Sequence, residues 1–136
     1  MLDVLVRTPA GKVARRGLPI FRGKNYVSVR DTATKAPAEN YYHGFLSALF
    51  ACAGNRINDF QSNAESGYGF ADIVFSSGYG TDRLGIVIEI KRTARPEELL
   101  DAVDNALKQI DEKNYAECLR RMRCRKHYAY GIAFCG

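Results

Sequence analysis

Apolar residues recur with a helical period in two stretches of the chain. The first helix is expected over residues 37–53, because Pro37 suits a first turn and an apolar stripe runs along these residues. Gly54-Asn55 is expected to end this helix. The stripe consists of Tyr41, Phe45, Leu49 and Ala53 and is widened by Leu46 and Phe50. A second helix is expected from Pro96, with a core-facing stripe of Leu99, Leu100, Val103, Ala106, Leu107 and Ile110. A third, shorter helix is expected over residues 115–123.

Other stretches have the β-branched and aromatic composition of strands. They are residues 57–61, 71–75, 85–90 and 127–134. The polar, glycine-containing residues 62–69 predict turns, and residues 76–82 predict a hairpin loop longer than the tightest kind. Short runs at residues 4–6 and 26–29, set among glycines and a proline, predict peripheral strands and loops over residues 1–35.

The elements follow the order helix, strand, strand, strand, helix, strand. This order favours an α/β fold in which a central mixed sheet is flanked by helices. A length of 136 residues fits one domain, with its core in residues 37–136. Because the chain begins and ends in strand-like sequence, we also expect that it is a piece of a longer protein.

The composition narrows the class of protein. With 46% hydrophobic and 26% charged residues, it is typical of a soluble globular domain. The sequence has neither a membrane-spanning apolar segment nor the layout of a secretory signal at its start, so a cytoplasmic location is expected. The four cysteines lack C-x-x-C spacing, which argues against a zinc site and favours free thiols.

Positive charge is concentrated in two places. The net charge is +5, with one cluster in the first thirty residues and another at the end of the third predicted helix. The second cluster contains Arg120, Arg121, Arg123, Arg125 and Lys126. Two interpretations stay open, a solvated surface and a rim that contacts the phosphates of a nucleic acid.

The hairpin formed by residues 71–90 brings charged side chains together. If Ser76 lies opposite Gly85, antiparallel pairing places Asp72 opposite Glu89, with their Cβ atoms about 5 Å apart. Glu89 and Lys91 then share one face of the strand, while Ile86, Ile88 and Ile90 occupy the other. Two carboxylates and one ammonium group converge.

A divalent cation would offset the repulsion between these carboxylates. Mg²⁺ binds one or two protein carboxylates and fills its remaining positions with water and phosphate oxygens. Lys91 would then lower the pKa of an attacking water and balance charge in the transition state. The alternative is structural: Lys91 makes an ordinary cross-strand ion pair with Asp72 or Glu89.

These residues and the order of elements resemble the PD-(D/E)XK nuclease superfamily, in which an acidic residue on one core strand precedes E-x-K on the next. The resemblance covers residues from about Glu39 to the end and implies a restriction-endonuclease-like αβββαβ core. Within the superfamily, the sequence motifs are most similar to those of bacterial RecB-like and AAA-ATPase-associated domains, and related domains occur in toxins. The similar motifs are Tyr42-His43-Gly44-Phe45, residues 62–69, Gly69-Phe70-Ala71-Asp72-Ile73, Ile88-Glu89-Ile90-Lys91, residues 106–110 and residues 131–134. No proline precedes Asp72, unlike the motif that names the superfamily.

The resemblance implies a role for each matching residue. Metal ligands would be Glu39, Asp72, Glu89 and the Ile90 carbonyl, and the metal Mg²⁺ or Mn²⁺. Catalytic residues would be Asp72, Glu89, Lys91 and Gln109, with Tyr115 as a weaker companion of Gln109. For some of these residues a structural alternative stays open. Gln109 could cap a carbonyl or face solvent, and His43 could be a packing residue. Gly67 and Gly69 could serve turn geometry.

Hypotheses of different classes follow. The first is a metal-dependent nuclease, with DNA favoured over RNA as its substrate and with nucleic acid held by Arg120, Arg121, Arg123 and Lys126. The second is a catalytically silent adaptor or nucleic-acid-binding module in a larger toxin, effector or ATPase-linked protein. The third is a purely structural hairpin. A second copy of the chain or neighbouring domains of a longer chain are further expected partners, and a toxin would act inside a host cell.

Overall fold

A computed structural model describes residues 3–7, 13–17 and 38–135 of the chain. For residues 3–7, 13–17 and 38–40 it describes the backbone alone. The strand predicted at residues 26–29 lies outside the described residues.

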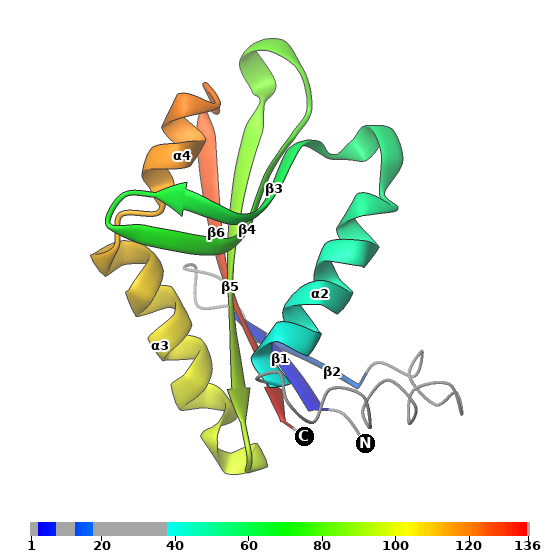
Figure 1. The fold of residues 1–136 in the computed structure, drawn as a ribbon, viewed down its shortest axis with the longest axis vertical. Helices are drawn as coiled ribbons and strands as arrows, with labels where there is room; N and C mark the ends of the chain where they lie inside the picture. The colour runs from blue at the N-terminus through cyan, green and yellow to red at the C-terminus, as the bar shows by residue number, and fades with distance from the viewer. Residues whose placement is uncertain (1–2, 8–12, 18–37, 136) are drawn as a thin grey trace.

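One mixed sheet forms the centre of the domain (Figure 1). Its strand order is β2-β1-β6-β5-β4-β3, in which β5 and β6 are parallel and all other neighbours are antiparallel. The strands are β1 (Asp3–Arg7), β2 (Val13–Gly17), β3 (Asn58–Ser66), β4 (Gly69–Ser77), β5 (Leu84–Thr93) and β6 (Lys126–Cys135). The mixed sheet flanked by helices agrees with the expected restriction-endonuclease-like core. β1 and β2, expected at the periphery, extend the sheet beyond β6.

Helices cover both faces of this sheet (Figure 1). Helix α2 (Ala38–Ala51) lies on one face, and α3 (Leu99–Glu112) and α4 (Ala116–Arg121) lie on the other. Short 3₁₀ turns precede β3, β5 and α3: η2 (Gly54–Arg56), η3 (Gly80–Asp82) and η4 (Pro96–Glu98). Among the described helices, none combines the length and the apolar character that crossing a bilayer requires.

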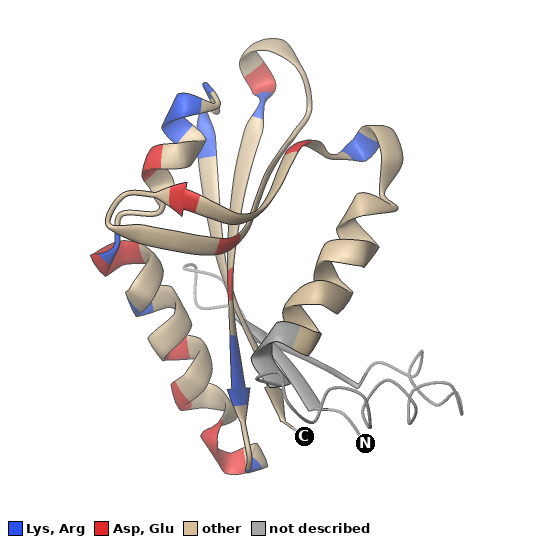
Figure 2. Ribbon diagram, in the orientation of Figure 1, with Lys and Arg blue, Asp and Glu red and all other residues tan. Residues whose placement is uncertain are grey.

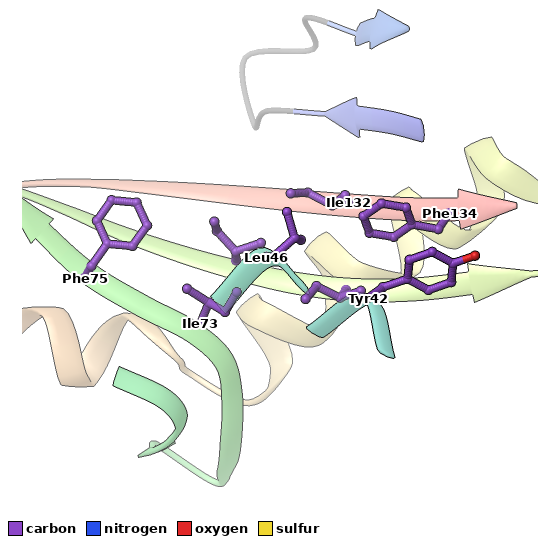
Figure 3. Close-up of a cluster of buried hydrophobic side chains, with 8 residues drawn as sticks. Tyr42, Leu46, Ile73, Phe75, Ile132 and Phe134 are labelled. Atoms are coloured by element: carbon purple, nitrogen blue, oxygen red, sulfur yellow. The ribbon is translucent and has the colours of Figure 1, made fainter. Parts of the chain in front are cut away.

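The core on the α2 face is mainly aliphatic and aromatic (Figure 3). Its buried members are Tyr42, Leu46, Ile73, Phe75, Ile88, Ile90, Ile132 and Phe134. The rings of Tyr42 and Phe134 stack with their centroids 4.3 Å apart. The predicted α2 stripe is confirmed for Leu46, which is buried, and for Tyr41, Phe45 and Phe50, which pack against this core. It was wrong for Leu49, which is 51% exposed, and it missed the buried Tyr42. The reason is that α2 faces the sheet through Tyr42 and Leu46, four residues apart.

The core on the other face joins α3 and α4 to the sheet. Helix α3 buries Leu99, Ala102, Val103, Ala106 and Ile110. The prediction was wrong for Leu100, which is 49% exposed, because it lies about 100° around the helix from Leu99. Gly131 lets α3 lie close to β6: a Cβ there would stand 2.7 Å from the Val103 carbonyl oxygen. This close approach sets the distance between α3 and the sheet.

The β3–β4 hairpin differs from the prediction. Residues 62–69 were expected as turns, but β3 continues to Ser66 and only Gly67 and Tyr68 form the turn. Gly67 has φ of 54°, and the Tyr68 N–H donates to the Lys113 carbonyl at 2.9 Å. The Ser66 hydroxyl donates to the Tyr115 carbonyl at 2.7 Å and accepts from the Cys118 N–H at 3.1 Å. Contacts with the α3–α4 connection therefore hold a polar segment in the sheet.

Candidate active site

Asp72 lies where β4 separates from β5. The predicted register is confirmed from Ser76 and Gly85 to Ile73 and Ile88, but the ladder ends there, so Asp72 and Glu89 are not a ladder pair as predicted. Beyond the Ile73–Ile88 pair, the Asp72 side chain takes the place of a backbone carbonyl as hydrogen-bond acceptor, since its Oδ2 accepts the Ile90 N–H at 2.7 Å. The bend of β4 across β5 is visible in Figure 1. The carboxylate is thus held against β5, next to Glu89.

Glu89, Lys91 and Gln109 form a closed set of polar contacts between β5 and α3. The Lys91 ammonium donates to Glu89 Oε1 at 3.1 Å and to Gln109 Oε1 at 2.7 Å. The Gln109 amide nitrogen in turn donates to Glu89 Oε1 and, at 3.1 Å, to the Tyr115 hydroxyl. Both amide hydrogens and the amide oxygen of Gln109 are therefore used. The alternatives of a solvated or carbonyl-capping Gln109 do not describe this geometry.

The carboxylates occupy an unfavourable electrostatic environment. Glu89 is only 3% exposed, and burial together with the nearby Asp72 charge raises its pKa to about 7, although Lys91 opposes the shift. Burial likewise raises the pKa of Asp72, opposed by its hydrogen bond from Ile90. Glu89 Oε2 is buried and has no hydrogen-bond partner among the described residues. An unpartnered buried carboxylate oxygen beside a second carboxylate suits a bound cation.

The donor set fits a metal that retains several water ligands. In residues with described side chains, no group of three or more His, Cys, Asp or Glu residues could hold an ion. Asp72 and Glu89 would supply two oxygens, and the Ile90 peptide lies beside them through its bond to Asp72. Two carboxylates with water and phosphate oxygens form a site typical of Mg²⁺. Glu39 lies in the first turn of α2, but its side chain lies outside what the structure describes.

His43 connects α2 to this site. Its Nε2 lies 2.9 Å from the Asp72 carbonyl oxygen and 3.0 Å from the Ser62 hydroxyl. Because a carbonyl oxygen only accepts, Nε2 carries the hydrogen and the Ser62 oxygen shares it. Ser62 was missed from the sequence, because its segment was interpreted as a turn. His43 therefore packs between α2 and the sheet and also holds the Asp72 backbone through the hydrogen bond from its Nε2.

Tyr115 and the glycines of the hairpin also meet near the site. Tyr115 is buried, and a Cβ on Gly69 would stand 3.2 Å from its hydroxyl. Gly69 therefore gives room to Tyr115. A Cβ on Gly67 would stand 2.1 Å from the Lys113 carbonyl, so Gly67 serves the turn and its close approach to the α3–α4 connection.

The predicted nucleic-acid-binding residues belong to α4, to the residues that follow it and to the start of β6, where Lys and Arg gather in Figure 2. Lys126 pairs with Leu84 at the start of β5, and Glu89 follows five residues later along that strand. At about 3.3 Å per residue, the separation along the strand is roughly 16 Å. Arg120, Arg121 and Arg123 are exposed at the end of α4. Arg120 donates to Asn114 Oδ1 and Arg121 to the Glu65 carbonyl, each at 3.1 Å.

Comparison with known proteins identifies one family. The family model of the PD-(D/E)XK nuclease superfamily matches residues 37–136, which include every element from α2 to β6. No curated protein and no solved structure matches the chain.

Proposed function

The chain belongs to the PD-(D/E)XK nuclease superfamily, and on this basis we propose that it is a nuclease that hydrolyses phosphodiester bonds with Mg²⁺ or Mn²⁺. DNA is favoured over RNA as the substrate. The observation that carries the proposal is the buried Glu89 carboxylate beside Asp72, with the Lys91 ammonium 3.1 Å from it. A lysine held next to a pair of carboxylates serves phosphoryl transfer, in which catalysis depends on positioning and charge.

The residues of the chain divide the work. Asp72 and Glu89 would hold the cation, with the Ile90 carbonyl and Glu39 as the further ligands that the resemblance implies. When bound, the cation polarises the scissile phosphate and lowers the pKa of a bound water. Lys91 has three N–H donors, of which Glu89 and Gln109 accept two. The third donor would be available to the attacking water or to a phosphate oxygen, and the Gln109 contact keeps the ammonium in place.

Surface charge supports a path for the nucleic acid. Helix α3 exposes acidic residues, which repel phosphate (Figure 2): Asp101, Asp104, Asp111 and Glu112. The basic side chains of Arg120, Arg121, Arg123 and Lys126 gather instead around α4 and the start of β6. We therefore place the nucleic-acid backbone along α4 and the β3–β4 hairpin, where Lys and Arg release counterions from the phosphates.

The test is a cleavage assay with three substrates side by side. Supercoiled plasmid, single-stranded DNA and RNA are incubated with the protein in Mg²⁺, in Mn²⁺ and in EDTA. Cleavage is expected only with metal, and Asp72→Ala, Glu89→Ala and Lys91→Ala should each abolish it. Asp101→Ala, which removes an exposed carboxylate of α3, is the matched control and should cleave like the wild type.

Each outcome has a defined meaning. Full activity in the three site variants overturns the proposal. Metal-independent binding of nucleic acid without cleavage favours the adaptor instead, since an adaptor has no need of a metal. Thermal melting of each variant establishes that lost activity reflects the site and not unfolding.

A further inference from the structure

Two aromatic side chains beside the candidate site take no part in either core. Phe70 is 62% exposed and Tyr68 is 79% exposed. Phe70 precedes Asp72 by two residues on β4, and the intervening Ala71 is fully buried in the cluster that packs against α4. Because neighbouring side chains on a strand point to opposite sides, Phe70 lies on the side of the hairpin away from α4, two residues along β4 from Asp72.

The exposed rings stand on a firmly held hairpin. Its turn is fixed by the bond from the Tyr68 N–H to the Lys113 carbonyl, and the preceding Ser66 is bound through both hydroxyl contacts with the α3–α4 segment. A ring on such a support loses little conformational entropy when it binds a ligand. Phe70 is therefore held in place before any ligand binds.

A cation reaches the edge of the same hairpin. Glu65 pairs with Phe70 across the hairpin, and the Arg121 guanidinium donates to the Glu65 carbonyl at 3.1 Å. The guanidinium therefore lies at the β3 edge, although Arg121 belongs to α4 on the opposite face of the hairpin from Phe70. Aromatic faces combined with basic side chains form the usual surface for single-stranded nucleic acid.

We propose that Phe70, extended by Tyr68, forms a stacking subsite for an unpaired nucleobase next to the cleaved phosphate. The inference rests on the proposed nuclease function and adds the strand state of its substrate. Two strand residues span about 6.6 Å, so the stacked base belongs to a nucleotide within a step or two of the phosphate at Asp72. Inside a duplex both faces of a base are covered by its neighbours, so Phe70 selects single strands, flaps or frayed ends.

The absence of tryptophan from the sequence gives a direct test of stacking. Phe70→Trp introduces a single tryptophan, which can be excited at wavelengths that the eight tyrosines do not absorb, and stacking of a base on its indole should quench the emission. Single-stranded oligo(dT) in EDTA is expected to quench Phe70→Trp saturably, and a blunt duplex of the same length is not. Tyr79→Trp is the matched control, because Tyr79 is 72% exposed in the loop between β4 and β5. Its emission should not change.

A second measurement links the ring to cleavage. Phe70→Ala should slow cleavage of single-stranded DNA by about ten-fold or more and change plasmid nicking by less than about two-fold. Quenching by duplex equal to that by oligo(dT), no quenching at all, or equal slowing of both substrates overturns the inference. If the protein cleaves nothing, the proposed function fails, whereas saturable quenching of Phe70→Trp would still establish the stacking subsite.

Discussion

Replacing Glu89 with glutamine isolates the cost of keeping a carboxylate buried in the site. The pKa of Glu89 is raised from 4.5 to about 7, first by burial and then by the Asp72 charge. Between these two values the folded protein binds more protons than the unfolded chain. The stability that protonated Glu89 contributes is therefore fully present below about pH 4.5 and is lost as the pH rises through about 7.

The magnitude follows from the two pKa values. A rise from 4.5 to about 7 corresponds to about 3 kcal/mol of unfolding free energy. Glu89→Gln removes this loss, so its stability relative to the wild type should improve by about 3 kcal/mol between pH 4.5 and pH 8. The buried amide of the new glutamine adds a cost of its own. That cost is the same at both pH values and cancels in the difference.

The assay is urea unfolding of both proteins in EDTA at pH 4.5 and pH 8. Asp101→Asn serves as the control, and because its carboxylate is exposed, its difference from the wild type should stay within about 0.5 kcal/mol at both values. Mg²⁺ should raise the stability of the wild type at pH 8 and leave Glu89→Gln unchanged. A Glu89→Gln difference that is the same at pH 4.5 and pH 8 would refute the reasoning.

Four further substitutions test the site and the packing around it. Gln109→Ala removes the amide that holds the Lys91 ammonium, and gel assays should show cleavage slowed about 10- to 100-fold. Gly131→Ala forces a methyl group against α3 and should cost about 1–3 kcal/mol in urea unfolding. Gly44→Ala, where a Cβ meets nothing within 4 Å, should instead stabilise by about 0.5–1 kcal/mol. Phe134→Ala should cost about 3–5 kcal/mol in the same measurement, and a loss below 1 kcal/mol would contradict the packing described.

Local pattern was enough to predict the hairpin that carries the charged residues. The isoleucines of β5 alternate with Val87, Glu89 and Lys91, so the charged residues share one face of the strand, and the Ser76–Gly85 register that was assumed agrees with the structure. The convergence of Asp72, Glu89 and Lys91 could therefore be predicted. The order of helices and strands is likewise local and agrees with the structure.

Features that depend on contacts between distant segments could not be predicted. Residues 62–66 have polar side chains typical of turns, and they remain a strand because Ser66 bonds to residues about fifty positions later. The exposure of Leu100 depends on which face of α3 meets β6. The capture of the Ile90 N–H by Asp72 arises from the divergence of two strands, which no periodicity reveals.

The mode of attachment of the β3–β4 hairpin has a consequence for how the domain can vary. Beyond Ile73 the tip has no ladder pair with β5 and is tied instead to the α3–α4 connection through the Tyr68 N–H and the Ser66 hydroxyl. Its outward side chains can therefore be exchanged while the backbone that orients the carboxylates keeps its anchors. The inward residues Ala64, Ser66 and Ala71 are buried and stay fixed, whereas exchanging the exposed positions of the tip is a route to retarget the domain without rebuilding its chemistry.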